Sequence, residues 1–397
     1  MRTRRAAALV VLAAVAAGCG SSTHQPVRAL SASGPPSAIR VGLADLLWPL
    51  EPERAKTRDE IVLARMLFST PLRTSPSGAL RPGLCTSWRS SGATWRLRCA
   101  HADAIAAQLQ RARLLDARSI TARGPELTIA LRAPDADLPY RLTQIAAAPA
   151  GVPGPFRLIS ASPKRVVAER NGVRVDVRKL APFAALKLFR AGKLDEAPVP
   201  LGDIRAVKLN PLLAPVVRVR RLLAADVVAF SPRVPADVRK VYDDTADRAD
   251  YQALVPEFQA PPAESLAVHG RPSASKAAIA LRDAKQRIPA LPRVPVRFTE
   301  PADPTLGYGT DLLVASWRDL GLGAVVGGGR DAALERLAAP YPRERALIAM
   351  GRGRHVVPIA WVADARLVSP RLEGWSEDEL GNVDYARIRL RGPSRSR

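Results

Sequence analysis

The sequence feature that most constrains the fold is a pair of cysteines, Cys85 and Cys99, that flank a stretch with two tryptophans. Alternating apolar and polar residues on both sides of Ser90-Ser91-Gly92-Ala93 predict a β-hairpin that sets the two cysteines opposite each other. Two thiols this close could form a disulfide, a redox pair or half of a metal site. The choice among them depends on the compartment in which the chain folds.

The N-terminus indicates that compartment. The first residues, MRTRRAAALVVLAAVAAGCG, have the basic start, short apolar run and small residues of a bacterial export signal. The apolar run is shorter than the roughly 20 residues that a membrane-spanning helix needs. Ala16-Ala17-Gly18-Cys19 resembles a lipobox, whose cysteine is acylated after cleavage; ordinary cleavage at an A-x-A site is the alternative. We therefore expect a signal peptide over 1–18, a lipid on Cys19, and a flexible Ser/Pro-rich tether over 19–38.

In an oxidising compartment, Cys85 and Cys99 are expected to form a disulfide. Zinc would need two further ligands, and the four histidines show no paired metal spacing. No C-x-x-C motif is present, so we predict neither a metal nor another cofactor. Two reduced, buried cysteines are the alternative.

The charge of the chain is strongly basic. Lysine and arginine number 60 against 37 aspartates and glutamates, a formal net charge of +23. Such a charge suits nucleic acid, anionic lipid headgroups or an acidic wall polymer. The basic residues are spread along the chain and aromatic residues make up only 5% of it, so no stacking platform emerges and we expect no nucleic-acid partner. The cluster Val217–Arg221 is interpreted as a strand with an exposed basic edge.

Strand-like and helical patterns are mixed along the chain, which predicts an α/β fold. Strands are expected at 39–43, 126–132, 165–170, 173–180, 227–230, 294–300 and 356–362. Helices are expected at 59–68, 101–115, 183–191, 236–250, 273–286, 311–320 and 331–337.

No catalytic motif is recognisable. The sequence has no G-x-S-x-G, no H-E-x-x-H and no P-loop. The glycines between 321 and 329 are interpreted as turns around a short strand, and the aspartates between 243 and 250 as a solvated helix face. We therefore expect a protein that is not an enzyme.

A resemblance to a known protein family begins in the segment that contains the Cys85–Cys99 hairpin. The segment 70–99 resembles the early part of the solute-binding lipoproteins of peptide-type ABC importers, the bacterial extracellular solute-binding family 5. The matching residues are Leu72, Gly78, Pro82, Leu84, Trp88, Trp95, Leu97 and Arg98. Further segments are similar to that family in the same order: 39–52, 151–158, 168–171, 188–199, 234–251 and 357–375.

The chain looks like a shortened, divergent member of that family. The family's F-x-D-G-x-P is absent after His101, and the segment between Ala324 and Tyr341 is shorter than in relatives. In peptide binders the latter segment lines the cleft and holds the amino end of the ligand. Trp361 and Asp364 mimic it, but we interpret them as part of the closing strand.

The resemblance implies an α/β, periplasmic-binding-protein-like type II fold, with two lobes around a cleft and an extra small lobe. Lobe I would comprise 39–47, 145–233 and 356–397. The small lobe would span 48–144 and lobe II 234–355.

The implied function is that of an extracytoplasmic lipoprotein, anchored to the outer face of the cell membrane, which captures a small peptide-like solute and presents it to an ABC permease and ATPase. The alternative is a degenerate member that serves as an envelope scaffold without transport. Trp48, Phe230 and Ser231 match positions that border the cleft in relatives and are the candidate ligand-binding residues. Ordinary packing in the core or hinge is their alternative role.

Overall fold

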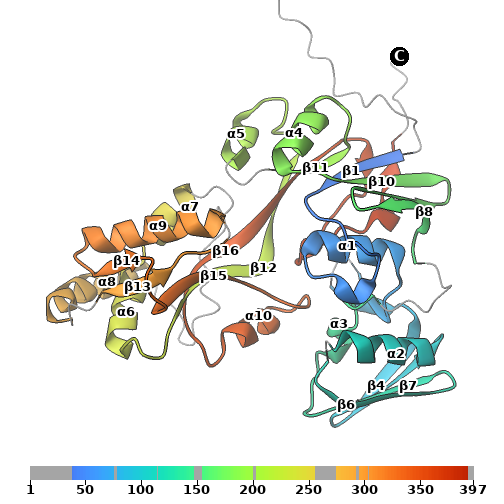
Figure 1. Ribbon diagram of the computed structural model, residues 1–397, viewed down its shortest axis with the longest axis horizontal. Helices are drawn as coiled ribbons and strands as arrows, with labels where there is room; N and C mark the ends of the chain where they lie inside the picture. Colours follow the sequence, from blue (N-terminus) through green and yellow to red (C-terminus); the bar gives the residue numbers. More distant parts are fainter. Residues whose placement is uncertain are drawn as a thin grey trace, which may run out of the picture.

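The computed structural model describes residues 38–75, 78–113, 115–146, 154–199, 203–254, 274–291, 295–302 and 304–391. Two bodies are joined by a pair of long strands (Figure 1). One body is lobe II; the other consists of lobe I with the small lobe beside it. The expected signal peptide, the tether and Cys19 lie outside the described residues. No described helix is long and apolar enough to cross a membrane.

One mixed sheet runs through both bodies. Its strands are β1 (Ala38–Leu43), β8 (Arg157–Ser162), β9 (Arg165–Arg170), β10 (Val173–Lys179), β11 (Glu196–Pro198), β12 (Val217–Phe230), β13 (Val296–Thr299), β14 (Ala324–Val326), β15 (Ala332–Ala338) and β16 (His355–Val368). Within the described residues their order is β14-β13-β15-β12-β16-β11-β1-β10-β9-β8. Strands β1, β10 and β11 are mutually parallel in lobe I, and β13, β14 and β15 are parallel in lobe II. The antiparallel pair β12 and β16 connects the two sets.

Lobe I packs helices and the C-terminal segment against the β1 end of this sheet. These elements are α1 (Arg58–Leu67), α4 (Pro182–Arg190), α5 (Ile204–Leu209), the short 3-10 helices η1 (Pro52–Arg54) and η6 (Tyr385–Arg387), and the pair β17 (Leu372–Glu373) and β18 (Arg389–Leu390). Helix α1 starts at a capping box in which the Thr57 hydroxyl accepts from the Glu60 backbone N–H and the Glu60 carboxylate accepts from that of Thr57.

The boundaries of the lobes differ from the sequence-based expectation. Helix α1 buries Val62, Leu63 and Met66 in the same core as β1 and the C-terminal segment, so it belongs to lobe I. The core of the small lobe begins at Leu72, not at residue 48. Strands β12 and β16 contribute to the cores of both lobes, because each crosses the junction without a break.

The small lobe contains the predicted hairpin. Its elements are β2 (Leu72–Thr74), β3 (Leu80–Pro82), β4 (Cys85–Ser91), β5 (Thr94–Cys99), α2 (Ala102–Ala112), β6 (Ala117–Arg123), β7 (Glu126–Leu131) and α3 (Leu138–Arg141). Cys85 stands opposite Cys99 in the β4–β5 register, and their sulfur atoms are bonded at 2.01 Å. Both cysteines are buried between α2 and the sheet.

Removing this bridge should lower stability without abolishing the fold. We expect the double substitution Cys85→Ala/Cys99→Ala to reduce the free energy of unfolding by about 3 kcal/mol, because the bridge restricts a loop of about 15 residues in the unfolded chain. The remaining core of the small lobe is still buried by α2 and β7. Chemical denaturation followed by circular dichroism would measure the effect. An unchanged midpoint under oxidising conditions would contradict the prediction.

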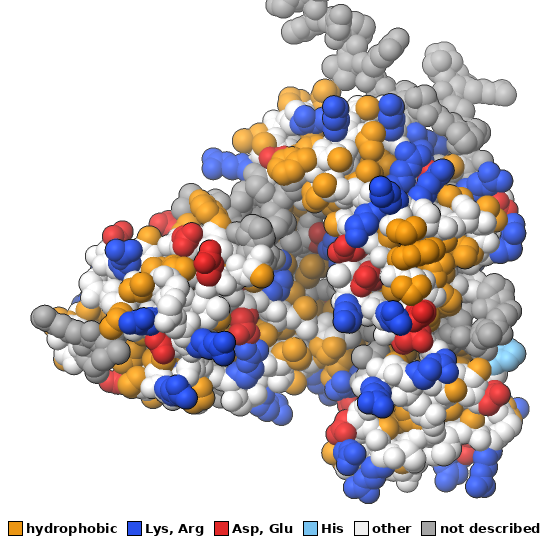
Figure 2. All heavy atoms as spheres, in the orientation of Figure 1, with side chains coloured by type: hydrophobic (Ala, Val, Ile, Leu, Met, Phe, Trp, Pro, Cys, Tyr) orange, Lys and Arg blue, Asp and Glu red, His pale blue; other side chains and the backbone are white. Residues whose placement is uncertain are grey.

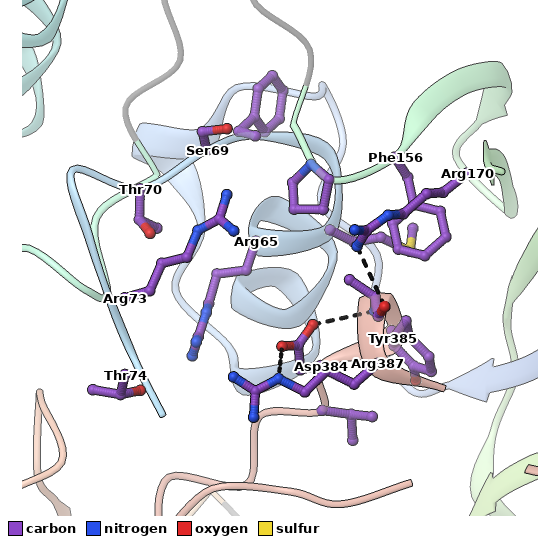
Figure 3. Close-up of a pocket in the computed structure, with 15 residues that line it drawn as sticks. Arg65, Ser69, Thr70, Arg73, Thr74, Phe156, Arg170, Asp384, Tyr385 and Arg387 are labelled. Carbon is purple, nitrogen blue, oxygen red and sulfur yellow. Dashed lines mark hydrogen bonds and ion pairs between the residues drawn. The ribbon is translucent and has the colours of Figure 1, made fainter. Parts of the chain in front are cut away.

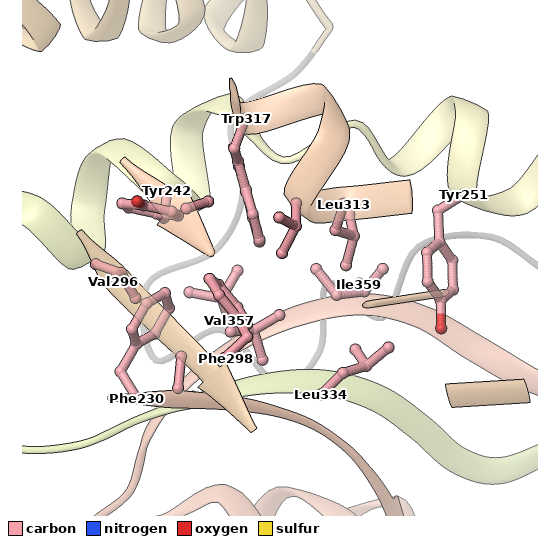
Figure 4. Packing of buried hydrophobic residues seen from close by; sticks show 14 of the residues in the cluster. Phe230, Tyr242, Tyr251, Val296, Phe298, Leu313, Trp317, Leu334, Val357 and Ile359 are labelled. Atoms are coloured by element: carbon pink, nitrogen blue, oxygen red, sulfur yellow. The ribbon is translucent and has the colours of Figure 1, made fainter. Parts of the chain in front are cut away.

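Lobe II is built around an aromatic cluster (Figure 4). Its helices are α6 (Ala236–Thr245), α7 (Arg248–Leu254), α8 (Ala274–Arg287), η5 (Ile288–Ala290), α9 (Pro304–Asp319) and α10 (Glu344–Gly351). The indole of Trp317 stacks on Phe298 with ring centroids 5.3 Å apart and meets the edge of Tyr242 at 4.9 Å. These contacts bind α6 and α9 to the β13 face of the sheet.

One element of lobe II contradicts the sequence-based expectation. Residues 331–337 were expected to form a helix, but Ala332–Ala338 is strand β15 between β12 and β13. Ala332 and Leu334 face the core, with partly exposed residues at the positions between and after them. Pairing on both edges therefore outweighs the helical propensity of alanine, leucine and glutamate.

Candidate functional site

The carboxyl ends of the parallel strands of both lobes point toward the junction between the lobes. In lobe I, β11 runs antiparallel to β16, which comes from lobe II, so β11 and its parallel neighbours β1 and β10 run toward lobe II. In lobe II, β15 runs antiparallel to β12 and therefore toward lobe I, together with β13 and β14. Figure 2 shows the surface hollowed between lobe II and the body formed by lobe I and the small lobe. Open α/β sheets bind ligands at this end of their strands.

Exposed aromatic side chains follow these carboxyl ends. Trp48 comes five residues after β1 and is 48% exposed. Phe183 stands in the first turn of α4, four residues after β10, and Tyr308 lies near the start of α9, which follows β13. Among the described residues, these three are the only exposed large aromatics. The sequence analysis singled out Trp48 but missed the other two, because helix-start positions carry no signal of exposure.

Phe230 and Ser231 do not border the hollow. Strand β12 leaves lobe I near Arg221, and its carboxyl end, Phe230, pairs with the first residues of β15 and β16 at the far end of lobe II. The Phe230 ring is buried against Tyr242 and Phe298. The chain thus crosses the junction about nine residues earlier than the family resemblance implied. Phe230 thus has the packing role that was its alternative, and the Ser231 hydroxyl accepts from the Arg233 backbone N–H at 3.3 Å in the turn after β12.

A set of polar contacts links the small lobe to lobe II across the junction. Buried Asp137, at the start of α3, accepts a hydrogen bond from the Tyr341 hydroxyl at 3.1 Å. It also forms an ion pair with Arg345 of α10. Next to it, the guanidinium of Arg343 stacks on the Tyr140 ring, 3.7 Å from its centroid. These residues lie about 200 positions apart in the chain, so sequence patterns gave no sign of them.

Asp137→Asn is expected to loosen this junction. The amide loses the charge that Arg345 meets, and hydrogen bonds to charged groups contribute about 1.5–3 kcal/mol. We therefore expect faster amide hydrogen exchange in α10 while the cores of both lobes keep their protection. The exposed Asp116→Asn, whose partner Arg132 is also exposed, is a control that should leave α10 unchanged. Equal exchange in α10 for both variants would show that the contact does not hold the lobes together.

Comparison with known proteins identifies the architecture. No protein-family profile and no curated protein sequence matches the chain. Among solved structures, the unliganded open form of the periplasmic murein tripeptide-binding protein MppA matches with a TM-score of 0.71 at 15% identity, over 89% of this chain and 97% of MppA. NikA from Brucella suis, in complex with Fe(III)-EDTA, matches at 0.69 and 14% identity, over 89% of this chain and 100% of NikA. OppA from Haemophilus influenzae, in complex with the peptide RPPGFSPFR, matches at 0.68 and 14% identity, over 89% of this chain and 99% of OppA.

The chain has a two-lobed, periplasmic-binding-protein-like fold. The three solved structures belong to the solute-binding family that the sequence resembles, so the resemblance is supported at the level of the fold. In this binding-protein fold, the long strands β12 and β16 form the connection between the lobes. Their register shifts between Arg221 and Ala225, where the Arg221 guanidinium lies over the buried Trp361 ring at 4.6 Å. Trp361 and Asp364 thus belong to the closing strand, as predicted.

A buried network of charges lies in lobe I, next to the point where the connecting strand β16 enters this lobe. Arg366 of β16 donates to Glu196 of β11 at 2.7 Å and to Asp364 at 3.0 Å, and Asp364 also pairs with Arg58 of α1 at 2.6 Å. Asp59 accepts from the Ala44 backbone N–H at 2.8 Å and lies 3.5 Å from Arg366. The network therefore ties β1, α1, β11 and β16 together just behind the carboxyl end of β1.

The carboxylates of this network have opposite electrostatic environments. Burial disfavours the charge of Asp364, but Arg58 and Arg366 together hold the pKa of Asp364 well below its usual range. Burial and the neighbouring Asp364 charge raise the pKa of Glu377 to about 8. Its Oε2 lies 3.8 Å from Arg366 and has no hydrogen-bond partner in the described part of the chain.

The remaining predicted site features have structural roles. Asp243 pairs with Arg248, and Asp244 pairs with Lys240 and with Arg287 of α8. The Asp244 side chain is only 10% exposed, so this helix face is less solvated than expected. The glycines at 321–329 surround the short strand β14. No group of three or more potential metal ligands occurs among the described residues.

Proposed function

We propose that this protein is an extracytoplasmic solute-binding protein of an ABC importer. The observation that carries the proposal is the convergence of the carboxyl ends of both parallel strand sets on one hollow, with exposed Trp48, Phe183 and Tyr308 in the segments that follow those ends. The solved neighbours are a murein tripeptide-binding protein, NikA in complex with Fe(III)-EDTA and OppA in complex with a peptide, which supports a solute-binding role. We place the acylated N-terminus at Cys19, and an ABC permease with its ATPase as partners.

Binding would act through the hinge and without bond chemistry. A solute that contacts both lobes shifts the equilibrium toward the closed arrangement, in which the lobes approach each other. The size of this shift is set by the difference between the solute's affinities for the open and closed states. The two continuous strands β12 and β16 bend most easily at the register shift between Arg221 and Ala225. The approach of the lobes then reports occupancy to the permease.

The solute class follows from the aromatic rim and the charge. Aromatic rings supply apolar contact area for a small organic molecule, and they leave its polar groups to the backbone. The strongly basic chain creates a field that favours anionic solutes and speeds their capture. We therefore propose a small, peptide-like and acidic solute.

Trp48→Ala tests the position of the site. We expect a solute found by thermal shift in a library of peptides, opines, sugars and metal chelates to bind this variant at least tenfold more weakly, because a desolvated aromatic contact is removed. The melting temperature without solute should stay unchanged, since Trp48 is half exposed. Ile279→Ala, an exposed apolar residue of α8, is the matched control and should keep full affinity.

The alternative, an envelope scaffold without transport, has a distinct outcome. If no library member shifts the melting temperature or changes the radius of gyration in small-angle scattering, importer function fails and the scaffold role replaces it. A solute whose affinity is equal in the Trp48 variant would place the site elsewhere.

A further inference from the structure

A second concave region lies at the opposite end of lobe I. Two adjoining cavities, of about 220 and 390 Å³, share residues of η6 and Arg170. They form where the end of α1, strand β2, the β9–β10 turn and the C-terminal segment meet (Figure 3). The β9–β10 turn stands at the amino end of β10, whereas the interlobe hollow lies at its carboxyl end. This region is therefore separate from the proposed solute site.

The lining of these cavities is strongly basic. One carboxylate, Asp384, and five arginines line the two cavities; the arginines are Arg65, Arg73, Arg170, Arg387 and Arg389. Arg65 pairs with Asp378 at 3.2 Å and Arg387 with Asp384 at 2.9 Å. Within the described ranges, the other three have no carboxylate partner; Arg170 donates only to the Ala386 carbonyl, at 3.3 Å. Three guanidinium groups are thus available for an anion.

Neutral groups complete the chemistry of a phosphate site. Ser69 lines the cavity and is buried, and its hydroxyl has no hydrogen-bond partner among the described residues. Figure 3 shows the side chains of Arg65, Arg73 and Arg387 around the same space. Guanidinium groups bind phosphate oxygens in a bidentate manner, and a hydroxyl adds a further donor. The rings of Phe156 and Tyr385 give the cavity an apolar wall.

The start of the described chain lies at this same end of lobe I. Ala38 pairs with Arg174, directly after the β9–β10 turn. Ala38 lies only 19 positions after Cys19, and a fully extended chain of that length spans at most about 65 Å. An acyl group on Cys19, as in the proposed function, would therefore hold the start of β1 within about 65 Å of the membrane.

We propose that this cavity binds the phosphate group of anionic membrane lipids, so that lobe I docks on the bilayer. A basic patch next to a lipid anchor supplies a second membrane-binding signal. Phosphate can also come from a soluble phosphoester, and the experiment must separate the two sources.

The test uses the full chain with Cys19→Ser, which removes the acylation site. The test variant adds Arg73→Gln, Arg170→Gln and Arg389→Gln, three exposed residues without carboxylate partners in the described structure. The control variant instead adds Arg89→Gln, Arg123→Gln and Arg318→Gln, which are also exposed and lie on the small lobe and lobe II. Both variants keep the same charge and the same N-terminal segment. Circular dichroism should show that both are folded.

Cosedimentation with phosphatidylglycerol vesicles is the first readout. We expect the control to bind them well and the test variant to bind about 100-fold more weakly, since each basic residue near an anionic surface contributes about fivefold. Pure phosphatidylcholine vesicles should bind neither strongly. Equal binding of the two variants to phosphatidylglycerol would overturn the proposal.

Titration with glycerol phosphate is the second readout. Binding of glycerol phosphate by the control but not by the test variant, without any difference on vesicles, would assign the cavity to a soluble phosphoester and overturn the membrane source. Neither readout involves the transported solute or Trp48. A failed solute screen and a failed lipid test are therefore distinguishable.

Discussion

Replacing Arg366 with methionine is expected to lower the free energy of unfolding by about 3–5 kcal/mol. Arg366 is 1% exposed and is the cation shared by Glu196, Asp364, Asp59 and Glu377. Removing one partner of a buried ion pair leaves the other charge without compensation in a medium that solvates it poorly. Methionine fills most of the volume, so the loss reports charge more than packing. Denaturation followed by circular dichroism and tryptophan emission would measure it.

The dependence of this effect on pH identifies its cause. Without Arg366, the pKa values of the buried carboxylates rise, and protonation then relieves the uncompensated charge. The deficit of the variant should therefore shrink as the pH falls from 7 toward 4. Arg354→Met is the control, because its partner Glu335 is similarly exposed and surface pairs contribute less than about 1 kcal/mol. A loss of the same small size for Arg366→Met would contradict a structural role for the network.

The network also explains how the hinge strands can be long and yet well fixed in lobe I. Strand β16 carries both Asp364 and Arg366, and their partners lie on α1, β11 and the segment after β17. Trp375 adds a hydrogen bond from its indole to Glu196 at 2.9 Å. The C-terminal half of β16 is thus held in place, while the register shift near Ala225 lies just outside the network. Bending between the lobes would concentrate there.

Local patterns predicted much of the sheet. The alternation in 165–170 and 173–180 gave β9 and β10 almost residue for residue, because each strand buries one face. The basic cluster Val217–Arg221 forms the exposed start of β12, which within the described strands pairs only with β16 there. The prediction of a helix at 331–337 was wrong because the composition of this segment favours a helix, while its pairing with β12 and β13 depends on residues far away in the chain.

The site was less predictable than the fold. Trp48 could be singled out because it follows the first strand, and Phe230 was misplaced because the sequence does not show where β12 crosses the junction. Arg366 and Asp59 are 307 positions apart, and Asp137 and Arg345 are 208 apart. Such pairs arise from the return of the chain to lobe I and to the small lobe. No periodicity within a short window encodes them.

Glu377→Gln is expected to stabilise the protein increasingly as the pH rises. The pKa of Glu377 is raised to about 8 in the folded chain, against about 4.3 in an unfolded chain. Between these values the folded protein holds a proton that the unfolded chain has released, so stability falls as the pH rises from about 4.5 to 8. Glutamine has no proton to lose, so the variant lacks this fall. Its advantage over the wild type should grow by up to about 4 kcal/mol between pH 5 and 8.

Unfolding midpoints measured at intervals between pH 5 and 8 test this expectation. Glu373→Gln, an exposed glutamate of β17 that pairs with Arg391, is the control and should give a curve parallel to that of the wild type. Parallel curves for Glu377→Gln as well would mean that this carboxyl is ionised throughout the range and that Arg366 compensates it fully. A curve that diverges upward only for Glu377→Gln would show that the network holds one carboxyl in its neutral form. In that case Arg58 and Arg366 have fewer ionised carboxylates beside them at neutral pH than the number of carboxyl groups suggests. The reason would be that burial disfavours a further negative charge more strongly than the two arginines stabilise it.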